Sequence, residues 1–353
     1  MKLTKSIQWV VLMIVITVAI ASCQSTPSYM RGDSIQAANS LRTDCRDIEH
    51  VMGKTKVCGQ PQRIVVLGPY LLEPLLALNV QAVAFADQGS FHRHDYTDPS
   101  KQIPYIGLRI TQPMVNVGLV YAPSIEAILK VQPDLILGLD INNTRQYATL
   151  ARIAPTLILK WTEPDMNLKA IAKAVNRSDQ AEQILKEKQQ QIATARQVFS
   201  SVVKTSPNLL LLSSSDLKEI FLVTNKHGLC SSLPQDLGFE LVSPPQLPRN
   251  PKAPFVPISL ETLPQLGQAD MVIFLGNNFS KPNQLKQASN FEDSQLANLK
   301  QAWSKSAIAQ SLNVSKSGKV YFIPTYICLG LPGSIGADLY LNELKKQILP
   351  TSE

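Results

Sequence analysis

Ser124-Ile125-Glu126 begins a segment of helical periodicity, and ten residues after its serine comes the apolar run Asp134-Leu135-Ile136-Leu137-Gly138. The second half of the chain has the same order. Ser259-Leu260-Glu261 is followed, eleven residues after its serine, by Asp270-Met271-Val272-Ile273-Phe274-Leu275-Gly276. A serine before a helical segment is a preferred N-cap, and a first-turn glutamate suits the positive end of the helix dipole. One such unit is an ordinary helix and buried strand, but a copy in each half predicts two similar α/β lobes.

Further short apolar runs predict the other elements of both lobes. The run that ends at Gly68-Pro69 is typical of a buried strand followed by a turn. The proline-rich segment 243–257 is expected to be an extended surface loop. We expect strands at 62–67, 82–85, 208–212 and 320–323, and helices at 71–78 and about 334–349.

A long helical stretch without glycine or proline lies between the lobes. Ser178 precedes apolar residues at helical spacing that continue to about Val203, and a shorter periodic segment, 166–175, comes before it. A continuous helix is a stiff connection, whereas a flexible linker is rich in glycine and serine. We predict an N-terminal signal at 1–22, a tether and disulfide segment at 23–60, an N-terminal lobe at 61–165, connecting helices at 166–204 and a C-terminal lobe at 205–353.

The N-terminus has the features of a secretory signal. Lys2 and Lys5 precede an apolar run, 9–21, that is shorter than the about 20 residues of a membrane-spanning helix. The segment Ile20-Ala21-Ser22-Cys23 resembles the lipobox of bacterial lipoproteins, in which the cysteine is lipidated and becomes the first residue. We expect lipidation of Cys23, and an ordinary signal peptide with a chance cysteine is the alternative. The polar residues 24–37 are typical of a tether.

Four other cysteines remain: Cys45, Cys58, Cys230 and Cys328. Disulfides persist in exported proteins, and four cysteines allow three pairings. We favour Cys45–Cys58 and Cys230–Cys328, one local pair and one pair within the C-terminal half. Free buried thiols are the alternative, above all for the second pair.

Composition and motifs argue against several function classes. Lysine and arginine exceed aspartate and glutamate by 34 to 27 without a long basic run, which does not favour nucleic-acid binding. The cysteine and histidine spacings match no zinc pattern. The sequence contains no G-x-S-x-G or H-E-x-x-H motif and no paired nucleophile and base. We therefore expect no enzymatic activity, no cofactor and no protein-held metal.

Taken together, the motifs resemble the binding proteins for iron-siderophores, haem and cobalamin over about residues 60–349. This resemblance implies two α/β lobes bridged by one rigid helix, a ligand cleft between the lobes, and delivery of the ligand to an inner-membrane ABC permease. Segments 68–74 and 327–333 are most similar to the cyanobacterial iron-siderophore branch. The other markers are 61–65, 73–78, 123–138, 147–156, 259–276, Trp303 and 318–321.

Ligands of open α/β sheets bind beyond the carboxyl ends of the strands, so loops at those positions predict the cleft. A ferric chelate is often anionic and partly apolar, which suits arginine forks and aromatic faces. The segment 91–94 is equally consistent with a solvated loop, and exposed arginines are common. Trp161 and Trp303 are expected to fill cores. The candidate ligand-binding residues are Tyr70, His92, Arg93, Arg109, Tyr121, Arg145 and Tyr326.

The resemblance also implies docking of the permease through acidic residues. Glu73, at the start of the first helix, takes this role in the N-terminal lobe. The matching position of the other lobe holds Ser232, and Asp236 is the acidic substitute one turn later. We expect a monomeric, lipid-anchored periplasmic protein that captures a ferric siderophore, with cobalamin or haem as the alternative ligand.

Overall fold

The computed structural model describes residues 44–89, 94–243, 253–278 and 288–349. Its N-terminal lobe is built on a six-stranded sheet in the order β6-β5-β4-β3-β7-β8. All neighbours are parallel except β5 and β6. Strand β3 (Ile64–Leu67), in the middle of the sheet, is buried along its whole length, which is why it appears in the sequence as a continuous apolar run. The strands are β3 (Ile64–Leu67), β4 (Ala84–Asp87), β5 (Val115–Leu119), β6 (Ala122–Pro123), β7 (Leu135–Leu139) and β8 (Thr156–Leu159).

The C-terminal lobe contains a second six-stranded sheet, in the order β12-β10-β9-β13-β14 with β11 beside β9. Its parallel part is β9, β11, β13 and β14, and β10 and β12 add antiparallel strands. The prediction of a surface loop over 243–257 is therefore wrong at the C-terminal end of that segment, because Phe255–Ile258 forms β12 and pairs with β10. The strands are β9 (Asn208–Ser214), β10 (Ile220–Val223), β11 (Glu240–Leu241), β12 (Phe255–Ile258), β13 (Met271–Gly276) and β14 (Val320–Pro324).

The predicted repeat forms the expected unit in each lobe. Ser124 caps α5 (Ile125–Lys130), since its Oγ accepts a hydrogen bond from the backbone N–H of Ala127 at 3.2 Å. Ser259 forms a capping box with Thr262 at the start of η3 (Leu260–Leu266). The second copy is a 3-10 helix with Pro264 inside it, a residue that removes a backbone donor.

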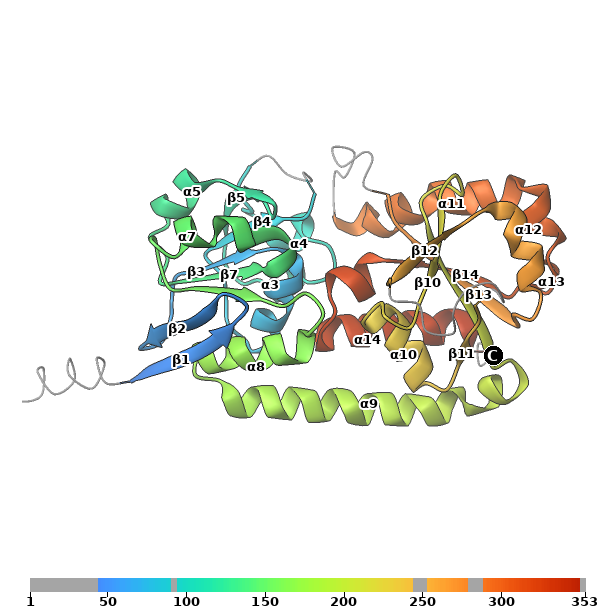
Figure 1. Cartoon of the computed structure of the whole chain (residues 1–353), viewed down its shortest axis with the longest axis horizontal. Coiled ribbons are helices and arrows are strands. Elements are labelled where there is room, and N and C mark those ends of the chain that lie inside the picture. The colour runs from blue at the N-terminus through green and yellow to red at the C-terminus, as the bar shows by residue number, and fades with distance from the viewer. Residues whose placement is uncertain (1–43, 90–93, 244–252, 279–287, 350–353) are drawn as a thin grey trace, which may run out of the picture. The chain divides into compact units, whose positions relative to one another are not determined.

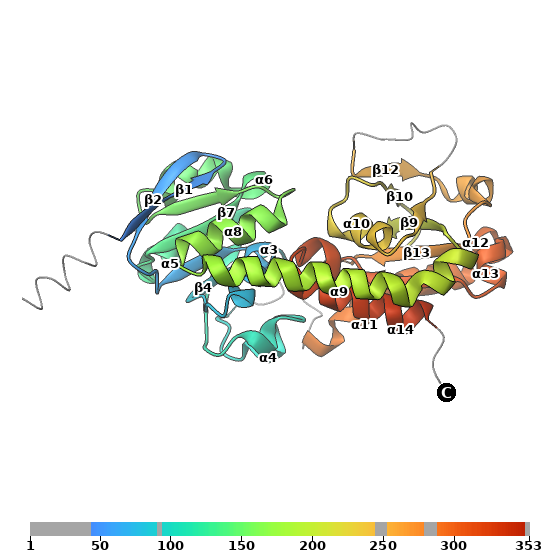
Figure 2. The ribbon, with the colours of Figure 1, turned by 90° about the horizontal axis from the view of Figure 1, so that it is seen from below.

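One helix joins the lobes, as the sequence predicts. Helix α9 (Ser178–Thr205) runs past both sheets, as Figures 1 and 2 show. Its Ala181 is part of the N-terminal core, whereas Ala195 and Phe199 belong to the C-terminal core. A second crossing is made by α14 (Ser334–Ile348), because Ile335 packs in the N-terminal core and Leu344 in the C-terminal core. The lobes are therefore held by two helices.

Shorter helices complete both lobes. Within the described ranges, no helix has the length and apolar character needed to cross a membrane. The helices are α3 (Pro69–Ala77), α4 (Pro99–Gln102), α6 (Asp140–Asn143), α7 (Tyr147–Leu150), α8 (Pro164–Ala174), α10 (Leu229–Asp236), α11 (Phe291–Lys305), α12 (Ala307–Ser311) and α13 (Asn313–Lys316), with the 3-10 turns η1 (Gly107–Arg109), η2 (Thr144–Gln146) and η5 (Ala288–Asn290) and the π-helical segment η6 (Tyr326–Gly330).

A hairpin lies before the first lobe, in a segment for which we predicted no secondary structure. Strands β1 (Cys45–His50) and β2 (Gly53–Cys58) form a two-stranded sheet. The Arg46 side chain donates hydrogen bonds to the carbonyl oxygens of Lys173 and Ala174 at 2.7 and 2.8 Å, at the end of α8. These contacts attach the hairpin to the lobe.

Candidate ligand-binding cleft

A pocket of about 180 Å³ lies at the carboxyl ends of the strands of both lobes. Its N-terminal wall comes from residues that follow β3, β4, β7 and β8, and its C-terminal wall from residues that follow β14. Strand ends of both lobes therefore contribute to one pocket, as the sequence predicts. The lining residues are Tyr70, Gln88, Leu139, Ile141, Asn142, Trp161, Thr325, Tyr326, Leu329 and Gly330.

A smaller pocket of about 60 Å³ lies next to it. The two pockets share Tyr70, Trp161 and Leu329, and we refer to them together as the cleft. The smaller pocket adds residues that follow β10 in the C-terminal lobe, chiefly Lys226 and His227. The cleft thus combines aromatic and aliphatic walls with a few polar groups, the usual composition of a small-molecule site.

Two of the predicted tyrosines line the cleft. Tyr70 is in the first turn of α3, and its hydroxyl donates a hydrogen bond to the carbonyl oxygen of Trp161. Tyr326 begins η6, and its ring stacks on Tyr105 and meets Phe291 edge-on, with centroids 6.0 and 4.9 Å away. Burial raises the pKa of both phenols. Both are therefore neutral, rigid aromatic faces at physiological pH.

Trp161 packs against the N-terminal core, as expected, and it also belongs to the cleft. It lines both pockets and is only half-buried. Its backbone N–H donates to Asp140 Oδ1 at 2.9 Å, which fixes the start of the loop after β8. Trp303, by contrast, is buried against Phe274 with ring centroids 4.8 Å apart, as expected of a core residue.

Three other predicted contacts do not line the cleft. Arg109, Tyr121 and Arg145 are all exposed, and none is among the residues that line either pocket. Burial raises the pKa of Asp338 on α14, and the charge of Arg109 opposes this effect, so Arg109 lies close to that carboxyl. The reasoning from strand ends identified the correct loops but not the direction of each side chain. His92 and Arg93 lie outside the described residues.

The cleft also contains polar atoms that the sequence reasoning missed. Thr325 Oγ1 and both ring nitrogens of His227 are buried without a hydrogen-bond partner in the described part of the chain. His227 lies four residues after the end of β10 and two residues before α10 begins. That position was the signal that could have identified it.

Glu73 is fully buried, which contradicts its predicted role in docking a permease. Its carboxylate accepts hydrogen bonds from the backbone N–H groups of Gly333, Ile335 and Gly336 at 2.7, 2.8 and 3.4 Å. These donors are at the first turn of α14, whose positive end attracts a carboxylate. Glu73 therefore links α3 to α14 from inside the protein.

The remaining predicted residues are placed as follows. Asp236 is exposed at the end of α10, and partial burial raises its pKa. Cys230 and Cys328 form a disulfide, and Cys45 and Cys58 are also disulfide-bonded. Cys23 lies outside the described residues. In the same described ranges, no three histidine, cysteine, aspartate or glutamate side chains gather as metal ligands would.

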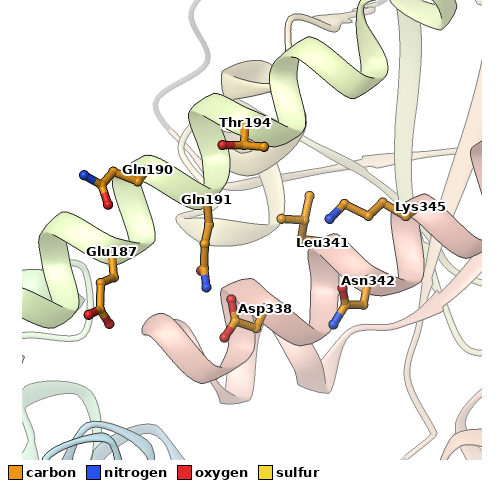
Figure 3. Close-up of a pocket in the computed structure, with 8 residues that line it drawn as sticks. All are labelled: Glu187, Gln190, Gln191, Thr194, Asp338, Leu341, Asn342 and Lys345. Atoms are coloured by element: carbon orange, nitrogen blue, oxygen red, sulfur yellow. The ribbon is translucent and has the colours of Figure 1, made fainter.

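A larger groove of about 520 Å³ lies away from these strand ends, between α9 and α14 (Figure 3). Glu187, Gln191, Asp338 and Lys345 line it from the two facing helices. Both signs of charge occur on its walls, and its position is unrelated to the carboxyl ends of either sheet. We therefore place the candidate site in the cleft and not in this groove.

Comparison with known proteins agrees with this geometry. The model of the family described as periplasmic binding protein matches residues 64–326, most of the chain. The chain belongs to this family. This binding protein is 23% identical to the Bacillus subtilis protein described as probable siderophore-binding lipoprotein YfiY, over 98% of its own length and 99% of the relative's. It is 28% identical to the Fe(3+)-citrate-binding protein YfmC of the same species, over 60% and 67% of the two chains.

Solved structures show the same fold. Staphylococcus aureus SirA, complexed with staphyloferrin B, superposes with a TM-score of 0.65 at 21% identity, covering 86% of this chain and 98% of that one. Bacillus subtilis FeuA, complexed with ferri-bacillibactin, gives a TM-score of 0.62 at 18% identity, covering 86% and 97%. The predicted architecture of two α/β lobes joined by a long helix is thereby confirmed.

Proposed function

We propose that this binding protein captures a ferric siderophore in the cleft and delivers it to an inner-membrane ABC permease. The observation that carries the proposal is the cleft itself, an aromatic-walled pocket that strand ends of both lobes build together. One relative that matches over almost the whole chain is named for siderophore binding, and another relative is named for Fe(3+)-citrate binding. Two lobes that are joined by helices and share one cleft suit the capture of such a ligand.

We place the protein outside the inner membrane, held by a lipid on Cys23. The relatives named as lipoproteins support an extracytoplasmic location. Asp236 remains the acidic docking candidate, because its side chain is exposed. Glu73 is not a candidate. We further propose that the mature protein acts as a monomer.

The test is a fluorescence titration of the mature protein with ferric siderophores of the hydroxamate, catecholate and citrate classes, and with haem and cobalamin. The mature chain has two tryptophans, Trp161 in the cleft and Trp303 in a core. A ligand in the cleft should quench Trp161 strongly. The Trp161→Phe variant should lose most of the signal, and Trp303→Phe should keep it.

The outcomes separate the hypotheses. Saturable quenching by at least one ferric siderophore supports the proposal. Saturation by cobalamin or haem alone would replace the ligand class. Arg145→Ala serves as a surface control, because its side chain is exposed outside the pocket walls, and exposed charges contribute about 0–1 kcal/mol. Its affinity should stay within about fivefold of wild type.

A further inference from the structure

His227 is fixed in place by its backbone while its ring is left without partners. The backbone N–H of His227 donates to Ser231 Oγ at 3.1 Å and to the carbonyl oxygen of Thr224 at 3.2 Å. The ring meets Phe255 edge-on, with centroids 4.1 Å apart. Only 1% of the residue is exposed, yet neither ring nitrogen has a hydrogen-bond partner in the described chain. Buried polar groups in native proteins are nearly always paired, so this ring is suited to a partner from outside the chain, either a water molecule or a group of a ligand.

The space beside the ring is suited to that partner. His227 lines the smaller pocket of about 60 Å³, which is open enough for about two water molecules or a small ligand group. Burial lowers the pKa of His227 to about 4, so the ring is uncharged at neutral pH. A neutral imidazole has one N–H donor and one nitrogen acceptor.

A second orphaned group lies on the same lobe. Thr325 is 3% exposed and lines the larger pocket, and its Oγ1 has no hydrogen-bond partner among the described residues. Leu329 lines both pockets and so connects the two sites along one wall. The C-terminal wall therefore offers uncharged groups that both donate and accept hydrogen bonds.

We propose that His227 recognises the organic arm of the bound chelate by exchanging hydrogen bonds with its uncharged groups, such as secondary amides. The ligand class is a ferric siderophore with amide-linked arms, and this inference rests on the proposed function. A carboxylate only accepts hydrogen bonds and would leave the acceptor nitrogen of the ring unpaired. An amide supplies both a donor and an acceptor. Tyr70, Trp161 and Tyr326 then pack against the apolar parts of the chelate.

The test uses iron-loaded desferrioxamine, whose arms carry amides, beside ferric citrate, which has none. Wild type should prefer the former. His227→Phe should weaken its binding about 10- to 100-fold, because the arm loses its partner in a buried site. His227→Gln, which keeps a donor and an acceptor, should recover most of the affinity. The unfolding temperature of ligand-free His227→Phe should equal or exceed that of wild type, because no internal hydrogen bond is lost.

His50 provides a matched control with the opposite pattern. Its Nε2 is 2.8 Å from Oγ1 of Thr55 in the same hairpin. Its Nδ1 accepts a hydrogen bond from the backbone N–H of Ile158 in β8 at 3.3 Å. His50→Phe should lower the unfolding temperature and leave binding unchanged. Equal affinities of wild type and His227→Phe, or a wild-type preference for ferric citrate, would overturn the inference. Failure of every ferric siderophore to bind wild type would instead overturn the proposed function.

Discussion

Replacing Glu73 by glutamine should flatten the dependence of stability on pH. In the folded protein, burial raises the pKa of Glu73 to about 7, against three backbone N–H donors that lower it. The ordinary pKa of a glutamate side chain is 4.5, which we take for the unfolded chain. Between these two values the folded protein binds the proton more tightly than the unfolded chain. The stabilising contribution of the protonated acid is therefore complete below pH 4.5, decreases as pH rises, and is lost above about pH 7.

The size of this effect follows from the two pKa values. Each unit of difference corresponds to about 1.4 kcal/mol, so the loss between pH 4.5 and pH 7.5 is roughly 3 kcal/mol. Glutamine cannot ionise but keeps one oxygen that accepts from the start of α14. The free energy of unfolding of Glu73→Gln, relative to wild type, should therefore rise by roughly 3 kcal/mol across that pH range.

Urea unfolding of ligand-free protein at half-unit pH intervals measures this difference. Asp87 is a second buried carboxyl group of the same kind, because burial raises its pKa to about 7 as well. Its carboxylate accepts a hydrogen bond from the backbone N–H of the neighbouring Gln88 and does not join distant helices. Asp87→Asn should flatten the curve similarly. Parallel curves for wild type and Glu73→Gln would refute the reasoning, since the carboxyl would then titrate equally in the folded and unfolded states.

A second perturbation is Gly333→Ala, whose new Cβ would lie 2.3 Å from Glu73 Oε2. This substitution should lower the stability of the protein at every pH.

Three other predictions follow from the chain. Cys23→Ala should release the processed protein from membranes or leave an uncut precursor, and unchanged fractionation would refute lipidation. Cys328→Ser should lower the free energy of unfolding by less than the about 2–5 kcal/mol typical of small exported domains, because both lobes have large cores; titration of four free thiols in unreduced wild type would exclude the bridges. Small-angle scattering should show little change in the radius of gyration on ligand binding, because two helices cross between the lobes; a large decrease would contradict the stiff connection.

Much of the fold could be predicted because its signals are local. Helix α9 begins at Ser178 as expected and ends two residues beyond the predicted limit, since its apolar period is long and uninterrupted. The buried strand β13 was equally clear as a continuous apolar run. The hairpin from Cys45 was missed because it is held by distant contacts, such as Arg46 with the end of α8. A sequence pattern contains no record of such contacts.

The site was predicted at the level of loops but not of side chains. The strand-end rule selected the loops of Tyr70 and Tyr326 correctly, because it depends only on sheet topology. The same rule cannot tell whether a side chain faces the cleft. Arg109 and Arg145 are exposed and do not line it. Charge was also a poor guide for Glu73, because an acidic residue in the first helix is equally suited to cap another helix inside the protein. Only the three-dimensional contacts distinguish these roles.

The placement of Glu73 connects ligand contact to the stiffness of the protein. Helix α3 presents Tyr70 to the cleft and Glu73 to α14, and η6 presents Tyr326 to the cleft immediately before α14 begins. The residues that line the cleft are therefore close in sequence to the contact by which Glu73 joins α3 to the start of α14. Loss of this contact would leave three buried backbone N–H groups without their acceptor, which is costly. We therefore expect ligand binding to act through side chains and loops at the cleft, while α9 and α14 keep the lobes at one angle.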